Sequence, residues 1–355
     1  MFQRRGLAGM KFSAHYLPTY IPELDGPEPE FYRRMLEQIS LLDELGFYQA
    51  WVTEHHFHEY GGTVPDPAIF LAAAACRTRQ IRLGVAISVL PLHHPLKIAE
   101  SYGMVDVISN GRLDFGIGRG NSELEQAQFG IDYAESPVRF RESAEVIQQA
   151  WSQTHVNYKG RHYQYDDIRV LPAPVQRPHP PFWVAANRSD DTYRWAGEQG
   201  CHLLVLPYMY EPAVLRQAID TYRAGLERSD IAPSSREVLG RVYVYVADSE
   251  AAAVREAGQY LDHYWAVAAQ HSRVQMSARS AAEQIAQGKV IAGSPEHVAE
   301  LIQKHGNELG MTIASCSFHF GGMPQEMALT NIQRFADEVM PRFQDRAIPT
   351  IGVRD

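Results

Sequence analysis

The chain has 355 residues, of which 45% are hydrophobic and 21% charged, so it suits one large α/β barrel or two ordinary domains and not a disordered chain. Its formal net charge of −9 argues against a general binder of the nucleic-acid phosphate backbone. The three cysteines, Cys76, Cys201 and Cys316, lie far apart, which argues against a disulfide framework or a zinc cluster and favours a reducing cytoplasm.

The chain shows no sign of a membrane segment. The longest apolar run is far too short to span a bilayer, and the two N-terminal arginines are not followed by the apolar segment of a signal peptide. We expect residues 1–9 to form a disordered extension, residues 10–345 a single barrel domain, and residues 346–355 a C-terminal tail.

Strand and helix signals alternate along the chain. Short apolar runs predict eight strands, over residues 11–16, 49–53, 81–89, 113–116, 182–186, 203–206, 242–246 and 312–317. Helical spacing, proline at first turns and glycine after last turns predict the intervening helices, over residues 29–46, 66–76, 95–109, 137–153, 190–198, 214–226, 295–304 and 327–340. Eight β-then-α units predict a (β/α)₈ TIM barrel with insertions.

Two stretches interrupt the alternation. Residues 154–181 are rich in Tyr, Pro and His, and we expect a hairpin or arm there. Residues 260–289 have weak helical periodicity, and we interpret them as a mobile lid.

The most informative motif is Glu54-His55-His56-Phe57, which closes the second predicted strand. In a parallel α/β fold, this places a carboxylate and two imidazoles at the strand end where ligands bind. Histidine is the side chain best suited to moving protons near neutral pH. From this segment alone, a surface or hydrogen-bonded core histidine explains the pattern equally well.

Glycines and an arginine follow the fourth predicted strand, in Gly116-Ile117-Gly118-Arg119-Gly120. Glycine lets a backbone approach a flat or anionic ligand, and arginine can bind phosphate with two parallel hydrogen bonds. The glycine spacing is not that of a dinucleotide fingerprint. Taken alone, a glycine-rich turn is the simpler interpretation.

Two further strand ends could contact such a ligand. Ala86, Ile87 and Ser88 near the end of the third strand could leave room for a planar ring. After the fifth strand, residues 187–189 lead into a helix, and helix N-termini bind phosphate. An ordinary N-cap is the commoner reason for such polar residues.

A metal site is the competing interpretation of the histidines. His55, His56, His58 and Glu59 are all potential ligands. Their spacing is not that of a helical zinc motif, and adjacent strand residues point to opposite faces, so we predict no metal.

Taken together and in order, these segments resemble the bacterial luciferase-like flavin monooxygenases, from about residue 11 to residue 343. The matching stretches are residues 51–57 (WVTEHHF), 89–95 (VLPLHHP), 111–120 (GRLDFGIGRG), 293–296 (GSPE) and 335–341 (FADEVMP). The resemblance implies a TIM barrel that takes reduced FMN from a separate flavin reductase. It also implies oxygenation of a small organic substrate with O₂ through a C4a-peroxyflavin.

The resemblance also assigns residues. His55 falls on the family's catalytic histidine, with Glu54 or a neighbour orienting it, and Arg119 falls on the arginine that binds the FMN phosphate. Ala86 and Ile87 fall on a non-prolyl cis peptide beside the flavin, with Ser88 and Gly118 near it. Asn187, Arg188 and Ser189 fall on a second phosphate-contacting loop. The candidate aromatic residues of the substrate pocket are Trp51, Phe57, Tyr208, Trp265 and Phe318.

Departures from luciferase bear on the activity. Gly118 stands where luciferase has a reactive cysteine, and the segment before Gly293 is shorter, so we expect oxygenation without light emission. A deazaflavin-dependent hydride-transfer enzyme on the same fold, a non-catalytic flavin-binding protein and a metal-dependent barrel hydrolase stay open. The family pairs subunits through helices that correspond here to residues 66–76 and 95–109, so we expect a homodimer.

Overall fold

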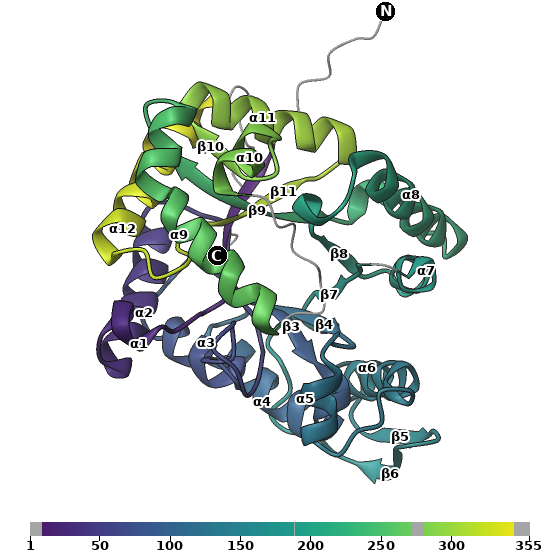
Figure 1. The fold of residues 1–355 in the computed structure, drawn as a ribbon. Helices are drawn as coiled ribbons and strands as arrows, with labels where there is room; N and C mark the ends of the chain where they lie inside the picture. Colours follow the sequence, from purple (N-terminus) through teal and green to yellow (C-terminus); the bar gives the residue numbers. More distant parts are fainter. Residues whose placement is uncertain (1–8, 188, 272–279, 344–355) are drawn as a thin grey trace, which may run out of the picture.

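Eight parallel strands close into a barrel in the computed structural model, which describes residues 9–187, 189–271 and 280–343 (Figure 1). Around the barrel the strands run β1, β2, β3, β4, β7, β8, β9 and β11, and the pairings β11–β1 and β8–β9 close the ring. Their bounds are β1 Lys11–Tyr16, β2 Gln49–Val52, β3 Arg82–Val89, β4 Leu113–Gly118, β7 Phe182–Ala185, β8 His202–Val205, β9 Val238–Val246 and β11 Ile313–Ser317. The predicted (β/α)₈ barrel is confirmed.

Helices surround this barrel (Figure 1). They are α1 Pro22–Asp25, α2 Glu28–Glu44, α3 Pro67–Ala75, α4 Pro95–Ile108, α5 Glu123–Gln128, α6 Ser136–Ser152, α7 Asp190–Glu198, α8 Pro212–Arg228, α9 Glu250–His271, α10 Ala281–Ala286, α11 Pro295–Leu309 and α12 Gln325–Arg334. Single turns complete the described chain: η1 Leu90–Leu92, η2 Pro207–Met209, η3 Pro233–Ser235, the π-type turn η4 Phe335–Val339 and η5 Met340–Phe343.

Most predicted elements are present, and the differences have local causes. Strand β9 begins at Val238, four residues before the predicted start, because Gly240 and Arg241 interrupt the apolar pattern although every residue of this strand is buried. Sequence reasoning missed α1, α5, α9, α10 and the short strand β10 (Ile291–Gly293), which pairs with β9. Within the expected lid, residues 260–271 belong to α9 and residues 272–279 lie outside the described residues.

The insertion at residues 154–181 contains the expected hairpin. Strands β5 (Val156–Lys159) and β6 (Gln164–Ile168) pair antiparallel, beside α6 in Figure 1. The terminal predictions fall largely outside the described chain, since residues 1–8 and 344–355 are not described. Among the helices that are described, none is long and apolar enough to cross a membrane.

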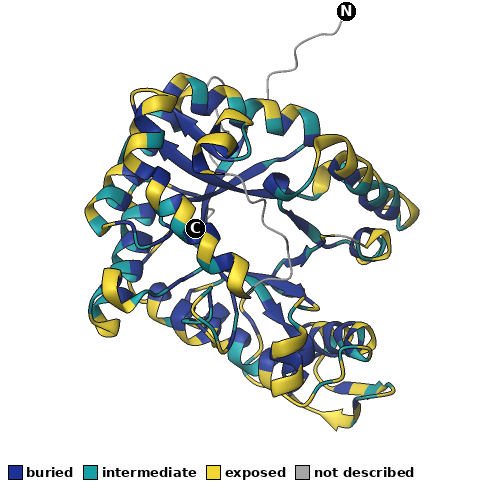
Figure 2. Ribbon diagram, viewed as in Figure 1, coloured by how far each residue is buried: buried dark blue, intermediate teal, exposed yellow. Residues whose placement is uncertain are grey.

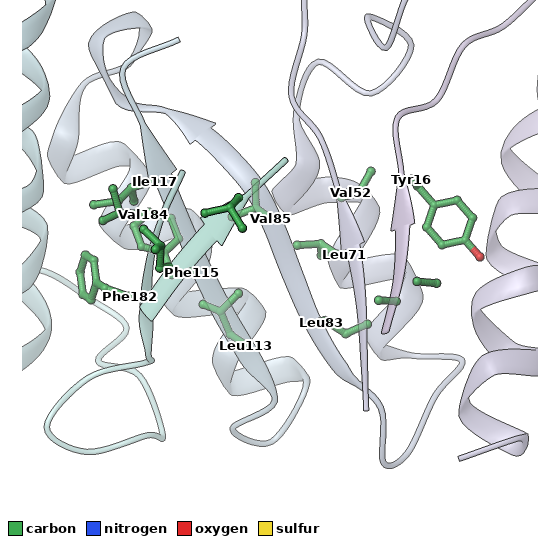
Figure 3. Packing of buried hydrophobic residues seen from close by; sticks show 14 of the residues in the cluster. Tyr16, Val52, Leu71, Leu83, Val85, Leu113, Phe115, Ile117, Phe182 and Val184 are labelled. Atoms are coloured by element: carbon green, nitrogen blue, oxygen red, sulfur yellow. The ribbon is translucent and has the colours of Figure 1, made fainter. Parts of the chain in front are cut away.

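The hydrophobic core has three parts, two of which lie against the barrel strands, and the third is a cluster around Tyr243 and Trp265. One lies between the strands and the helices around them, where the side chains of β3, β4 and β7 meet those of the surrounding helices (Figures 2 and 3). The other fills the barrel itself with Trp51, Trp183, Leu204, Leu239 and Ile313. The two indole rings meet edge to face with their centroids 5.2 Å apart. A Cβ at Gly84 would lie 2.2 Å from Trp51 Cε3, so only glycine fits beside this indole.

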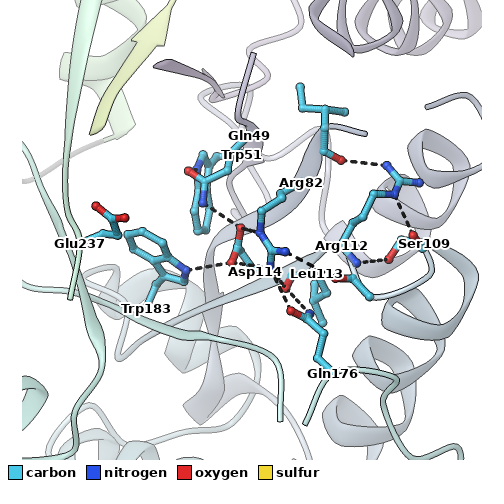
Figure 4. Close-up of polar contacts among 12 residues, drawn as sticks. Gln49, Trp51, Arg82, Ser109, Arg112, Leu113, Asp114, Gln176, Trp183 and Glu237 are labelled. Carbon is cyan, nitrogen blue, oxygen red and sulfur yellow. Dashed lines mark hydrogen bonds and ion pairs between the residues drawn. The ribbon is translucent and has the colours of Figure 1, made fainter. Parts of the chain in front are cut away.

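A polar network occupies the amino-terminal end of the barrel (Figure 4). The buried carboxylate of Asp114 accepts hydrogen bonds from Arg82 Nε (2.8 Å), Gln49 Nε2 (2.8 Å) and Trp183 Nε1 (3.2 Å). These donors come from β2, β3 and β7, so the network ties neighbouring strands together where they enter the barrel. The opposite, carboxyl-terminal end is where a parallel barrel binds its ligands.

Candidate active site

A first histidine–carboxylate cluster lies where β2 ends. Oε1 of Glu125 accepts from His55 Nδ1 (3.0 Å), His58 Nε2 (3.0 Å) and the backbone N–H of His56 (3.2 Å). Glu125 is only 2% exposed and lies in the first turn of α5, where Ser122 Oγ accepts from its N–H. Burial raises the pKa of Glu125, but the hydrogen bonds from His55 and His58 outweigh it and lower that pKa to about 2.

This contact determines which nitrogen of His55 is available. Because Nδ1 donates to the Glu125 carboxylate, Nε2 is the atom left to take or give a proton. The side chain of His55 is 22% exposed, which leaves its ring accessible at the barrel mouth. The arrangement suits a general acid or base held in one orientation.

A second cluster lies beside the first. The buried carboxylate of Glu54 accepts from His93 Nε2 (2.7 Å), His56 Nε2 (3.2 Å) and the backbone N–H of Val89 (3.2 Å). Burial lowers the pKa of His93, but the hydrogen bond and charge of Glu54 raise it overall. Glu54 therefore links the ends of β2 and β3, and the carboxylate that holds His55 is Glu125.

The expected cis peptide is present between Ala86 and Ile87 in β3. Both residues are partly buried and pack against the cluster that fills the barrel. Gly118, at the end of β4, faces them, because a Cβ there would lie 2.1 Å from Ile87 Cδ1. Ser88 is fully buried beside Tyr102 of α4. Backbone and small side chains therefore line this part of the barrel, an arrangement against which a flat ring can pack.

Arg119 follows directly and has an available guanidinium group. It is exposed, its Nη2 donates to Tyr133 OH (3.3 Å), and its Cζ lies 4.9 Å from the centre of that ring. Within the described ranges it pairs with no carboxylate, so it is free to bind a phosphate. Of the second phosphate loop, Asn187 is exposed, Ser189 is the N-cap of α7 with no side-chain cap bond, and Arg188 lies outside the described residues.

The candidate pocket aromatics lie in four different places. Trp51 is in the barrel core, and Phe318 packs between Phe47 and Phe335 outside the barrel. Phe57 is 60% exposed. Tyr208 and Trp265 are buried together in a cluster that includes Tyr243 of β9.

Both histidine clusters have the composition of a metal site. In each, the three ligand atoms lie within 4.8 Å of one another. Every histidine in them also lies at hydrogen-bond distance from a carboxylate, which accounts for the clusters without an ion. The prediction that there is no metal stays a prediction.

The mouth of this closed parallel barrel carries an oriented histidine, a cis peptide against a glycine, and Arg119, which has no carboxylate partner among the described residues. The sequence profile described as luciferase-like monooxygenase matches residues 10–312. The chain belongs to this family.

Individual relatives support this assignment. The chain is 28% identical to the oxygenase component of flavin-dependent trigonelline monooxygenase from Acinetobacter baylyi, over 90% of this chain and 92% of that protein. It spans 63% and 60% of two uncharacterised Sinorhizobium fredii proteins, and it is 34% identical to each over the matched part. The structure of monooxygenase RslO1 from Streptomyces bottropensis matches with a TM-score of 0.88 and 30% identity, over 94% of this chain and 100% of that one.

More distant structures share the fold alone. The oxygenating constituent of 3,6-diketocamphane monooxygenase from Pseudomonas putida, solved with FMN, has a TM-score of 0.78 and 20% identity, over 94% of this chain and 98% of that one. The coenzyme F420-dependent tetrahydromethanopterin reductase from Methanopyrus kandleri has a TM-score of 0.72 and 22% identity, over 95% and 100%. The barrel is therefore common to enzymes that use either cofactor.

Proposed function

We propose that this protein is an oxidoreductase that uses reduced FMN and O₂ to oxygenate a small organic substrate. The observation that carries the proposal is the pair His55–Glu125 at the same barrel mouth as the Ala86–Ile87 cis peptide, Gly118 and Arg119. Reduced FMN would supply the electrons for activating O₂. As the resemblance implies, the flavin would come reduced from a separate reductase.

The chain's own residues have distinct parts in this proposal. Ala86, Ile87 and Gly118 hold the flavin ring, and Arg119 binds its phosphate with help from the loop at residues 187–189. His55 Nε2 transfers a proton at the reacting centre, and Glu125 holds the imidazole in the required tautomer. Glu54 supports the backbone of β3 through Val89. The apolar wall of the barrel excludes water from the reacting atoms.

The alternative is a deazaflavin-dependent hydride transfer, because that cofactor is used on the same fold. Arg119 and Gly118 suit either cofactor's phosphate and ring. A protein that binds flavin without catalysis is the third possibility.

An anaerobic titration with reduced FMN and, in parallel, reduced deazaflavin distinguishes these functions. Tight binding of reduced FMN, followed by a transient flavin–oxygen absorbance on mixing with O₂, is the expected result. Binding of the deazaflavin alone, without an oxygen intermediate, would move the protein to hydride transfer. Binding of reduced FMN with no oxygen intermediate and no substrate-dependent oxygen uptake would leave a non-catalytic binder.

A further inference from the structure

Arg241 is a buried cation at the carboxyl end of the barrel, and no carboxylate of the described residues pairs with it. It lies on β9 and is 4% exposed. Its Nε donates to Ser317 Oγ (3.2 Å), and its Nη2 donates to Tyr243 OH (3.0 Å) and Tyr264 OH (3.5 Å). Within residues 9–187, 189–271 and 280–343 it forms no ion pair, and its Nη1 has no hydrogen-bond partner.

Two other arginines of the barrel wall are fully engaged. Arg82 binds the Asp114 carboxylate through both Nε and Nη2, at 2.8 and 2.9 Å. Arg112 donates to the carbonyls of residues 75, 78, 81 and 109 and to Thr78 Oγ1. Burying a guanidinium without a counter-charge is unfavourable, and a ligand that supplies the missing charge would offset this cost. Of these three arginines, Arg241 is the one with a donor, Nη1, that has no partner among the described residues and with a charge that no described carboxylate balances.

The hydroxyls around Arg241 are neutral and cannot supply that charge. Burial raises the pKa of Tyr243 and of Tyr60 well above the ordinary value of a phenol. The hydroxyls form a chain, because Tyr243 OH donates to Tyr264 OH (2.8 Å) and Tyr264 OH donates to Tyr60 OH (3.2 Å). Each group in this chain donates to the next, from Arg241 towards Tyr60, so the hydroxyl of Tyr60 is the last donor.

This chain of hydroxyls leads to the catalytic histidine. The ring of Tyr60 lies 6.1 Å, centroid to centroid, from the ring of His55 and 5.5 Å from that of Tyr264. Arg241, the tyrosines and His55 therefore belong to one continuous site.

Arg241 faces the proposed flavin site across the barrel. In the closed ring three strands separate β9 from β3 on either side, so the two strands are opposite each other. Residues 239, 241 and 243 alternate onto the face that Leu239 shares with Trp51 inside the barrel. A substrate between Arg241 and the Ala86–Ile87 peptide would therefore have Arg241, which binds it, on one side and the proposed flavin on the other.

Unsatisfied polar atoms line the same place. Trp265 Nε1 is buried without a hydrogen-bond partner among the described residues, and its ring packs 4.9 Å from that of Tyr243. His15 Nδ1 on β1 is likewise buried and unsatisfied. Buried polar groups are usually paired, so two orphan atoms near one unpaired cation indicate a ligand that completes them.

We propose that Arg241 is the specificity-determining residue of the substrate pocket and that the substrate is an organic anion. A carboxylate or similar oxyanion would accept from Arg241 Nη1, with Tyr60 and Trp265 as further donors. This proposal rests on the proposed function, since it names the substrate class for the same site.

The test compares wild type, Arg241→Gln and Arg241→Lys, with Arg33→Gln as a matched control, because Arg33 is an exposed arginine on α2. Each protein is titrated, with and without FMN and at constant ionic strength, with formate, acetate and benzoate and with the neutral analogue benzamide. Dissociation constants come from calorimetry and from the rise in unfolding temperature. Circular dichroism verifies that each variant folds.

We expect at least one carboxylate to bind wild type and the Arg33→Gln control, and Arg241→Gln to weaken it about 10- to 100-fold, as for loss of a charged hydrogen bond. The affinity for benzamide should be the same in all the proteins. The affinity of Arg241→Lys for the carboxylate should lie between those of wild type and Arg241→Gln. Equal responses of wild type and Arg241→Gln to every carboxylate, including no response in either, would overturn the proposal.

Anaerobic titration of the same variants with reduced FMN separates this proposal from the proposed function. Unchanged affinity for reduced FMN in Arg241→Gln is expected. Weakened reduced-FMN binding, with FMN displacing the carboxylate, would assign Arg241 to the flavin and overturn the substrate assignment. Carboxylate binding that depends on Arg241 in a protein that binds no flavin would sink the proposed function and leave the anion site standing.

Discussion

Oε1 of Glu125 lies 3.0 Å from Nδ1 of His55, although 70 residues separate them in the chain. The contact joins the end of β2 to α5, the short helix that follows β4. The same connection begins with Arg119, so the proposed phosphate-binding group and the carboxylate that orients His55 lie on one segment. Only five residues lie between Arg119 and Glu125. We therefore expect a phosphate bound at Arg119 to affect the position of the Glu125 carboxylate.

His55→Ala should lower turnover by about 10²–10⁴-fold if His55 is the acid or base, because the reacting centre loses its proton carrier. Reduced FMN should still bind, since the ring and phosphate contacts assigned above lie on other residues. Stopped-flow measurement at saturating reduced FMN checks this. A His58→Ala variant is the control, as it removes the other imidazole held by Glu125. An unchanged rate in His55→Ala would remove His55 from the chemistry.

Glu125 should make the free energy of unfolding fall at acid pH. Its pKa in the folded chain is about 2, below the ordinary value of 4.5, so its carboxylate stabilises the fold fully above pH 4.5. That contribution is lost as the pH falls from 4.5 toward 2. Urea unfolding as a function of pH should therefore show a steeper loss for wild type than for Glu125→Gln. Glu37→Gln, on the exposed face of α2, is the control and should follow wild type. Parallel curves for wild type and Glu125→Gln would contradict the assignment.

Arg119→Gln should weaken binding of FMN about 10- to 100-fold, the usual range for loss of a charge-assisted hydrogen bond. Binding of riboflavin, which has no phosphate, should be unaffected. Titration of both flavins by fluorescence quenching gives the two dissociation constants. An equal loss for riboflavin and FMN would show that Arg119 acts on the ring or on the fold, and not on the phosphate.

Gly118→Ala should disturb the proposed ring site through Ile87. The added Cβ would lie 2.1 Å from Ile87 Cδ1, so the isoleucine must move beside the cis peptide. Overpacking of this kind costs about 1–3 kcal/mol, and we expect weaker flavin binding. Ile87→Val removes Cδ1, so the double variant should recover the affinity that Gly118→Ala loses. Flavin titration of the two single variants and the double variant forms the cycle. Absence of recovery would mean that the two side chains are not coupled.

A homodimer through α3 and α4 stays a prediction, and the structure offers a surface for it. Four large apolar side chains are exposed on these helices, namely Ile69 (71%), Met104 (51%), Val107 (43%) and Ile108 (45%). Exposed apolar patches of this kind mark interaction surfaces. Ile69→Lys with Met104→Lys should convert a dimer into a monomer by light scattering at micromolar concentration. Val214→Lys, at a 60% exposed position on α8, should leave the mass unchanged. A wild-type monomer would refute the prediction.

The sequence alone determined the architecture and the strand ends that carry the candidate site. Apolar periodicity and proline–glycine punctuation are local properties, so the barrel strands and most helices could be predicted, and β1 was predicted to the residue. The strand-end motifs placed His55 and Arg119 at the carboxyl edge for the same reason. The cis peptide at Ala86–Ile87 came from the family resemblance, since nothing in the local composition indicates it.

Only the tertiary structure decided which groups meet. Glu125 stands in a short helix with no apolar periodicity, and its contact with His55 depends on how the β4–α5 connection folds back over β2. Arg241 interrupts an otherwise apolar strand, which concealed the start of β9. The interruption was the only sign of Arg241 in the sequence. Its burial inside the barrel could be known only once the barrel had closed. Closure brings β9 beside β11 and opposite β3, and it buries the guanidinium among hydroxyls, with no carboxylate of the described chain beside it.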